Sequence, residues 1–138
     1  TSTTGRQTNA VLLPSNSGNF ETDEKITQAT TGAVGRVVEW DATNKILYYQ
    51  QERFSNYGVD SSNNTVAFSG TNTINGATSS ASGTPSSSSS TVDSAVFASG
   101  YSTPELQPDS GDIIYIENRR PISRASDQTE DIKIIVEF

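Results

Sequence analysis

The chain has 138 residues, 16 of them acidic and 9 basic, with a net charge of −7 at pH 7. This length suits one domain, and the acidic balance argues against a general nucleic-acid binder, because neutralising phosphates needs a basic face. His, Cys and Met are absent, which excludes disulfides and disfavours a zinc site. No apolar run approaches the ~20 residues that a membrane helix needs.

Position 1 is Thr1 and the sequence contains no methionine. We therefore expect the chain to be the C-terminal part of a larger protein. Residues 1–138 are expected to form a single β-rich domain, in which residues 1–20 are an extended arm.

Residues 34–49 contain the clearest local hairpin. Val34–Trp40 is rich in β-branched residues, Asp41–Lys45 suits a short loop, and Ile46–Tyr49 is a second strand. Asp41 can open a type I turn, and Asn44 tolerates the left-handed conformation. Apolar residues occur on both faces of the first strand, which predicts a place inside a sheet or a sandwich.

Weaker signals flank this hairpin. A strand is predicted at 25–29, followed by a turn at 30–33, and a short one at 66–68. Asn75-Gly76 is typical of a tight turn between 71–74 and 77–79. Residues 79–90 are almost entirely Ser, Gly, Ala, Thr and Pro. They have little apolar surface to offset the entropy of ordering, so 79–110 is predicted to be a loop that is flexible or ordered by a partner.

The last third of the sequence recovers strand patterning. Residues 112–117 follow a turn at 108–111, and apolar residues alternate through 132–138. No stretch shows helical periodicity over ten residues. The predicted fold class is therefore all-β: an antiparallel, sandwich-like domain with a long Ser/Gly-rich loop.

Side-chain catalysis has few candidates here. Without His, general bases reduce to carboxylates, Lys or Tyr, and no serine has a recognisable activating neighbour. A carboxylate pair for glycoside hydrolysis stays as a weak alternative. The densest acidic group is Asp127, Glu130 and Asp131, which lacks the spacing of a calcium loop and has arginines nearby for ion pairing. We predict no enzyme activity, no metal and no cofactor.

Arg119, Arg120 and Arg124 form the one basic cluster in this acidic sequence. Arginine is favoured at protein interfaces and in bidentate contacts to carboxylates, so these three are the candidate partner interface. Exposed surface charge is the alternative. Tyr48, Tyr49, Tyr57 and Tyr101 are either platforms for sugar stacking or strand residues that pack within the sheet.

Two segments resemble a known family. Asp112-Ile-Ile-Tyr-Ile-Glu-Asn-Arg-Arg-Pro-Ile-Ser-Arg124, with the rest of 111–138, resembles the C-terminal end of a baseplate wedge subunit of T-even-like contractile phages, especially those that infect cyanobacteria. Residues 31–41 and 46–49 resemble the hairpin that precedes it in the same family.

The resemblance implies an all-β subunit without catalytic activity, located in the virion at the tail baseplate and assembled in the host cytoplasm. It also implies contacts with other wedge proteins and a homodimer within the wedge, with no nucleic-acid or membrane partner. The alternative from a different class is a carbohydrate-binding or adhesin domain on a virion or cell surface, which the Ser/Thr content and the tyrosines also fit.

Overall fold

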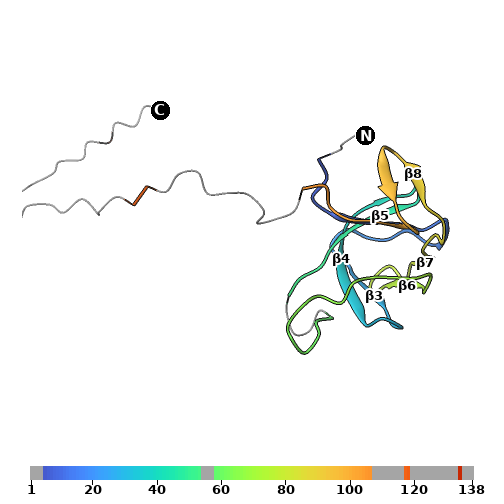
Figure 1. The fold of residues 1–138 in the computed structure, drawn as a ribbon, viewed down its shortest axis with the longest axis horizontal. Helices are drawn as coiled ribbons and strands as arrows, with labels where there is room; N and C mark the ends of the chain where they lie inside the picture. The colour runs from blue at the N-terminus through green and yellow to red at the C-terminus, as the bar shows by residue number, and fades with distance from the viewer. Residues whose placement is uncertain (1–4, 54–57, 107–116, 119–133, 135–138) are drawn as a thin grey trace, which may run out of the picture.

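The computed structural model describes residues 5–53, 58–106, 117–118 and 134. Its regular structure there is entirely β, which confirms the predicted fold class (Figure 1). The strands are β1 Asn9–Leu12, β2 Ser15–Ser17, β3 Lys25–Gln28, β4 Ala33–Asp41, β5 Ile46–Gln50, β6 Ile74–Gly76, β7 Ser82–Thr84, β8 Ser90–Val92, β9 Ala95–Phe97 and β10 Tyr101–Ser102. All their pairings are antiparallel.

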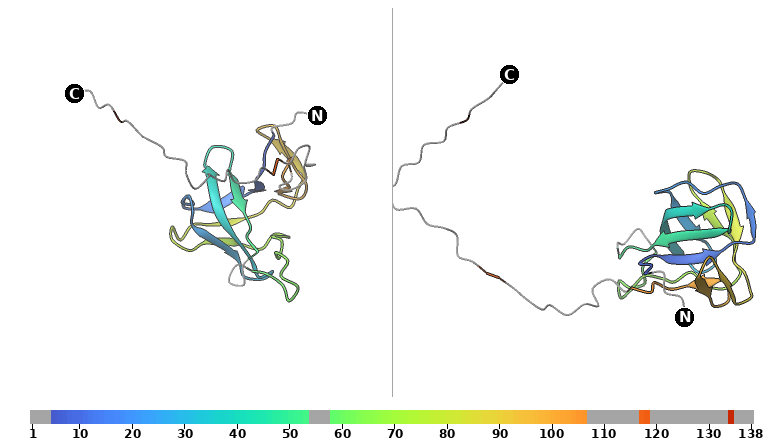
Figure 2. Two further views of the ribbon diagram at one scale, coloured as in Figure 1. Left: turned by 90° about the vertical axis from the view of Figure 1, so that its left-hand side faces the viewer. Right: turned by 90° about the horizontal axis from the view of Figure 1, so that it is seen from above.

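Eight strands form one sheet in the order β10-β1-β5-β4-β3-β6-β7-β2, and β8 and β9 form a separate hairpin. The connection between β1 and β2 shows that this sheet must curl. Only Leu13 and Pro14 separate the two strands, a link that spans at most about 11 Å. In a flat sheet their positions would be about 29 Å apart, at about 4.8 Å per strand spacing. The sheet therefore bends back on itself into an open barrel (Figures 1 and 2).

The inside of the barrel holds the main core. Leu13, in the link between β1 and β2, is fully buried and packs so closely on Gly83 that a Cβ at that glycine would lie 2.7 Å from Leu13 Cδ1. The ring of Tyr49 meets that of Phe68 edge-on at 4.8 Å between centroids. The buried residues of this cluster are Val11, Leu13, Phe20, Ile26, Ala33, Val37, Leu47, Tyr49, Phe68, Ile74 and Ala81.

A second, smaller cluster lies on the other face of β1 and β5. Side chains alternate between the two faces of a strand, so Ala10 and Ile46 point away from the barrel core and meet Ala95 and Phe97 of the β8–β9 hairpin. Phe97 is fully buried. The hairpin thus covers one outer face of the barrel, which is the sandwich-like part of the architecture.

The predicted hairpin at 34–49 is confirmed, with two corrections. β4 lies between β5 and β3, inside the sheet as expected. The left-handed residue of the loop is Lys45, at φ 61°, rather than Asn44, while Asp41 opens the turn by accepting hydrogen bonds from the amides of residues 43 and 44. A bulge between Val37 and Glu39 shifts the register, so Trp40 packs with the core cluster on the Val37 side, whereas strict alternation through 34–40 would put it on the opposite face.

Other local expectations differ from the structure. Residues 9–12 and 15–17 are strands of the sheet, where an extended arm was expected, because Ala10 and Val11 are fully buried. Residues 66–68 pair with no strand, although Phe68 is buried. Asn75 and Gly76 lie within β6, and the turn follows them.

Four strands, β7 to β10, lie within residues 79–110, where a loop was predicted. Contacts with distant residues order this Ser-rich stretch, since Ala81, Ala95 and Phe97 are all buried. That a partner orders part of it stays a prediction. The strands predicted at 112–117 and 132–138 lie almost entirely outside the described residues.

Candidate interaction surfaces

The predicted arginine interface cannot be placed in the fold. Arg119, Arg120 and Arg124 all lie outside the described residues, as do Asp127, Glu130 and Asp131. Their roles at an interface or in ion pairs stay predictions.

The tyrosines proposed as sugar platforms are mostly engaged within the barrel. Tyr49 is only 4% exposed, and burial raises the pKa of its hydroxyl. Tyr101 is partly buried, and its hydroxyl donates to the carbonyl of Gly70 at 2.8 Å and accepts from Gln28 at 3.3 Å. Tyr48 is also partly buried, against the smaller cluster. Tyr57 lies outside the described residues. The described tyrosines therefore fit packing within the sheet better than stacking on a sugar.

A buried carboxylate fixes the turn between β6 and β7. Glu24, at the start of β3, is 4% exposed, and its carboxylate accepts hydrogen bonds from the amides of Glu21, Thr78 and Ser79 and from the Ser79 hydroxyl, at 2.7 to 3.0 Å. Burial acts to raise the pKa of Glu24, but these bonds outweigh it and hold the pKa below its ordinary value. These four hydrogen bonds occupy both oxygens of the carboxylate, so Glu24 is a structural residue.

Residues 5–8 and 102–106 form a second polar cluster, here named the Arg6–Glu105 junction. The Arg6 guanidinium donates to the carbonyls of Thr8, Ser102 and Thr103 and to the Ser102 hydroxyl. The Glu105 carboxylate in turn accepts from the amide of Gly5 at 2.6 Å. Two distant parts of the sequence are thereby fastened together beside β1 and β10.

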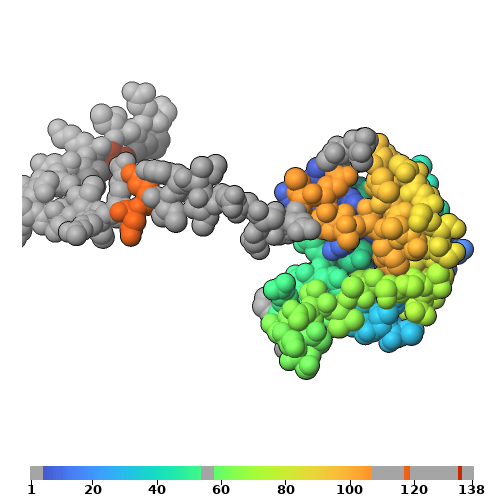
Figure 3. All heavy atoms as spheres, viewed as in Figure 1, coloured from blue at the N-terminus to red at the C-terminus, as the bar shows by residue number. Residues whose placement is uncertain are grey.

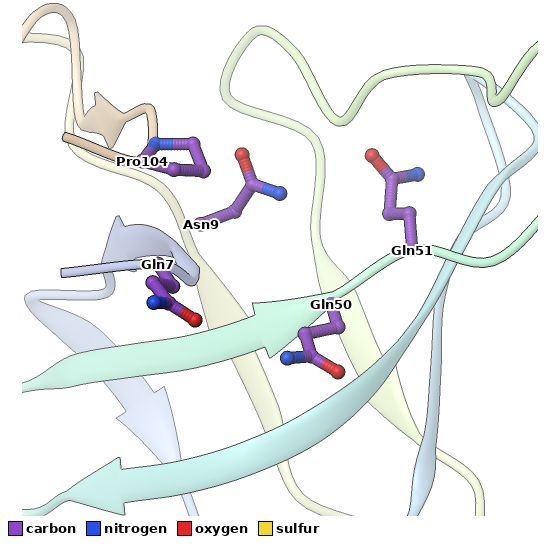
Figure 4. Close-up of a pocket in the computed structure, with 5 residues that line it drawn as sticks. All are labelled: Gln7, Asn9, Gln50, Gln51 and Pro104. Atoms are coloured by element: carbon purple, nitrogen blue, oxygen red, sulfur yellow. The ribbon is translucent and has the colours of Figure 1, made fainter. Parts of the chain in front are cut away.

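Next to this junction lies a cleft of about 310 Å³. β1 and β5 are antiparallel neighbours, so the start of β1 lies beside the end of β5. Their terminal residues converge there with the segment that follows β10, as Figure 4 shows. The described residues of its lining carry no charge: they are four carboxamides and one proline ring, from Gln7, Asn9, Gln50, Gln51 and Pro104.

One of these carboxamides is fixed by the fold. The Nε2 of Gln51 donates to the carbonyls of Val34 and Val66, at 3.1 and 2.7 Å. The side chains of Gln7, Asn9 and Gln50 form no hydrogen bonds with the part of the chain that the structure describes. The sequence offered no signal for this cleft, since Gln7 and Gln51 are brought together only by the pairing of β1 with β5.

The described part of the chain contains no cluster of metal-ligating side chains. Within residues 5–53, 58–106, 117–118 and 134, no three acidic side chains cluster as metal ligands would. Over the same ranges no helix has the length and hydrophobicity to cross a membrane.

Comparison with known families finds a similarity to a phage tail baseplate family over the C-terminal part of this chain. The matching family model is that of bacteriophage T4 Gp8, a baseplate wedge protein, and it matches residues 81–138. This confirms the resemblance drawn from residues 111–138. The hairpin at 31–49 lies outside the match, so that part of the resemblance stays a prediction. Neither the curated proteins nor the solved structures gave a match.

The match begins directly before β7. Its described part contains β7, which lies between β6 and β2, the edge strand β10, and the β8–β9 hairpin, which covers one outer face of the sheet. In Figure 3 residues 81–106 of the match, coloured yellow to orange, form a continuous area on the face shown. Residues 81–106 of the match are therefore both a part of the barrel wall and a part of its surface.

Proposed function

We propose that this chain is a non-enzymatic structural component of a phage tail baseplate, which joins neighbouring wedge subunits through protein–protein interfaces. The observation that carries the proposal is the family match over residues 81–138. The all-β fold agrees with it, because a curled sheet whose β1 and β2 are joined by a short link, and whose outer face is covered by a hairpin, is a rigid support for partner contacts.

The partner contacts are proposed to include Arg119, Arg120 and Arg124. Permanent interfaces of this class typically bury about 2,000 Å² or more, and arginine is enriched in them. Surface of that size would also stabilise a domain whose apolar content is only 32%. We further propose a homodimer within the wedge, located in the virion after assembly in the host cytoplasm.

Co-purification tests the proposal. The tagged chain is produced together with the other baseplate proteins of the same phage, and the complex is isolated through the tag. We expect wedge proteins to co-elute, and gold-labelled antibody against the tag to mark the baseplate end of assembled tails. A chain that elutes alone and leaves the tails unlabelled would show that the assignment is wrong.

The arginines are tested in the same assay. We expect the triple variant Arg119→Ala/Arg120→Ala/Arg124→Ala to lose most of the co-eluting protein, whereas the control Lys25→Ala/Arg53→Ala, which removes two exposed cations of the barrel, keeps it. Equal recovery with both variants would remove the arginines from the interface. Sedimentation of the purified chain over a concentration series measures the dimer.

A further inference from the structure

The described residues that line the cleft carry no charge, which restricts what the cleft can bind. A carboxamide has two N–H donors and a carbonyl oxygen with two acceptor sites. Three of the four carboxamides in the lining have all of these groups available, and the fourth, Gln51, keeps its oxygen. A charged ligand would lose its hydration here without gaining an opposite charge, which is costly. The cleft therefore suits a neutral ligand that both donates and accepts hydrogen bonds.

The charges of the adjacent Arg6–Glu105 junction do not alter this conclusion. The Arg6 guanidinium is held by the backbone around residues 8 and 102–103. The Glu105 carboxylate faces the amides of residues 5 and 6. Both charges serve the Arg6–Glu105 junction and are absent from the cleft lining.

Two kinds of neutral ligand offer alternating donors and acceptors: a sugar with its hydroxyls, and the backbone of an extended polypeptide. Protein sites commonly hold a sugar ring against an aromatic face, and no described residue of the lining is aromatic. A peptide group, by contrast, presents one N–H and one C=O, and a carboxamide can pair with both. The cleft volume lies at the small end of the range for ligand sites, which fits a short stretch of extended chain lying against the Pro104 ring.

We propose that this cleft binds an extended, uncharged polypeptide segment of another baseplate protein. The proposal rests on the proposed function for the class of partner. It adds a surface that the sequence did not indicate, formed by residues 7, 9, 50, 51 and 104. Gln51, fixed by two hydrogen bonds, orients the site, while Gln7, Asn9 and Gln50 turn to meet the backbone groups of the partner.

The test uses the full chain and short overlapping peptides that tile the other baseplate proteins of the same phage. Peptides that bind are titrated into isotope-labelled protein, and the side-chain amide resonances of Gln7, Asn9 and Gln50 are followed by NMR. A glycan array is probed in parallel. Thermal unfolding of every variant checks that it is folded, which we expect because Gln7 and Gln50 are exposed.

The expected result is saturable binding of a neutral peptide that shifts these side-chain resonances. The Gln7→Ala/Gln50→Ala variant should bind the same peptide at least about tenfold more weakly, since two hydrogen-bonding groups are lost. The matched control Asn72→Ala/Asn75→Ala removes two exposed carboxamides near β6, away from the cleft, and should bind like the natural chain.

Three outcomes would overturn the inference: no peptide binds, the two variants bind equally, or a glycan is the ligand that shifts the cleft resonances. Co-elution with wedge proteins is read separately. If wedge proteins co-elute but the cleft binds no peptide, the cleft assignment is wrong and the proposed function stands. If nothing co-elutes, the proposed function itself is wrong.

Discussion

Replacing Glu24 with glutamine tests how a single carboxylate orders the Ser-rich part of the chain. Its Oε2 accepts the amides of Thr78 and Ser79, both at 3.0 Å, and its Oε1 accepts the Glu21 amide at 2.8 Å and the Ser79 hydroxyl at 2.7 Å. Gly76 lies so close that a Cβ there would stand 2.7 Å from both carboxylate oxygens. The space beside Gly76 is therefore filled by the Glu24 side chain, and glutamine has the same shape as glutamate.

Glutamine nevertheless supplies one acceptor oxygen where glutamate supplies two. With the amide oxygen in the Oε2 position, both amides of the turn stay bonded, and the Ser79 hydroxyl can rotate to accept from the new NH₂ group. The Glu21 amide then has no acceptor, which costs about 1–3 kcal/mol, and the retained bonds lose the benefit of a charged acceptor. We expect Glu24→Gln to lower the free energy of unfolding by about 2–3 kcal/mol.

Urea unfolding at pH 7 measures this change, with the fluorescence of Trp40, the one tryptophan of the chain, as the signal. Trp40 suits the purpose because its ring packs edge-on against Phe20, with centroids 5.3 Å apart. The control is Glu21→Gln, which alters an exposed side chain on the same turn and should change the stability by less than about 0.5 kcal/mol. Equal midpoints for the two variants would refute the reasoning.

The same variant gives a pH dependence with a defined sign. The folded-state pKa of Glu24 lies below its ordinary value of 4.5, so the ionised form is stabilised by folding. This contribution is complete above the unfolded pKa and is lost as the pH falls through the folded one. The difference in stability between the natural chain and Glu24→Gln should therefore be full at neutral pH and shrink in acid. A difference that stays constant well below pH 4.5 would contradict the assignment.

Three further substitutions test other parts of the fold. Phe97→Ala should cost about 3–5 kcal/mol because it removes the fully buried ring beneath the hairpin, whereas the neighbouring Val96→Ala, at a position 58% exposed, should leave the thermal midpoint nearly unchanged. Gly35→Ala should cost about 1–3 kcal/mol, since its Cβ would lie 2.9 Å from a backbone carbonyl of β5; a thermal midpoint equal to that of the natural chain would contradict this close approach. Arg6→Ala should speed hydrogen exchange at the amide of Glu105, which is bonded to the carbonyl of residue 6; unchanged exchange there would show that the guanidinium does not hold the junction.

The parts of the fold that the sequence predicted well are those with local signals. The β4–β5 hairpin depends on residues that are neighbours in the chain, and Asp41 begins its turn as expected. The bulge at Val38 left no such signal, because an extra residue in one strand is defined only against its partner. The strict alternation of side chains between two faces therefore holds up to Val37 and fails at Trp40.

The Ser-rich stretch shows why low apolar content misled the prediction. Residues 79–90 have little apolar surface of their own, but the Ser79 amide bonds to Glu24 from 55 positions along the chain, and Gly83 packs under Leu13. Small residues are what this close packing requires. Such contacts join distant positions, and one sequence does not reveal them.

The two candidate interaction surfaces also differ in whether the sequence alone indicates them. Arg119, Arg120 and Arg124 stand out as a cluster in the sequence, although they lie outside the described residues. The carboxamide cleft has the opposite character. Gln7 and Gln51 are ordinary polar residues in the sequence. Only the register of β1 against β5 brings them together, at the end where β1 begins and β5 ends.

The Arg6–Glu105 junction has a mechanical consequence. The Gly5 amide and the Glu105 carboxylate are bonded across 100 positions of sequence, a length of chain that would reach about 330 Å if extended. Tension carried along the polypeptide therefore crosses from one side of the junction to the other without passing through the barrel. While the junction holds, the strands of the barrel bear none of this tension. A pull on the chain therefore strains the hydrogen bonds of the junction before it strains any strand of the core.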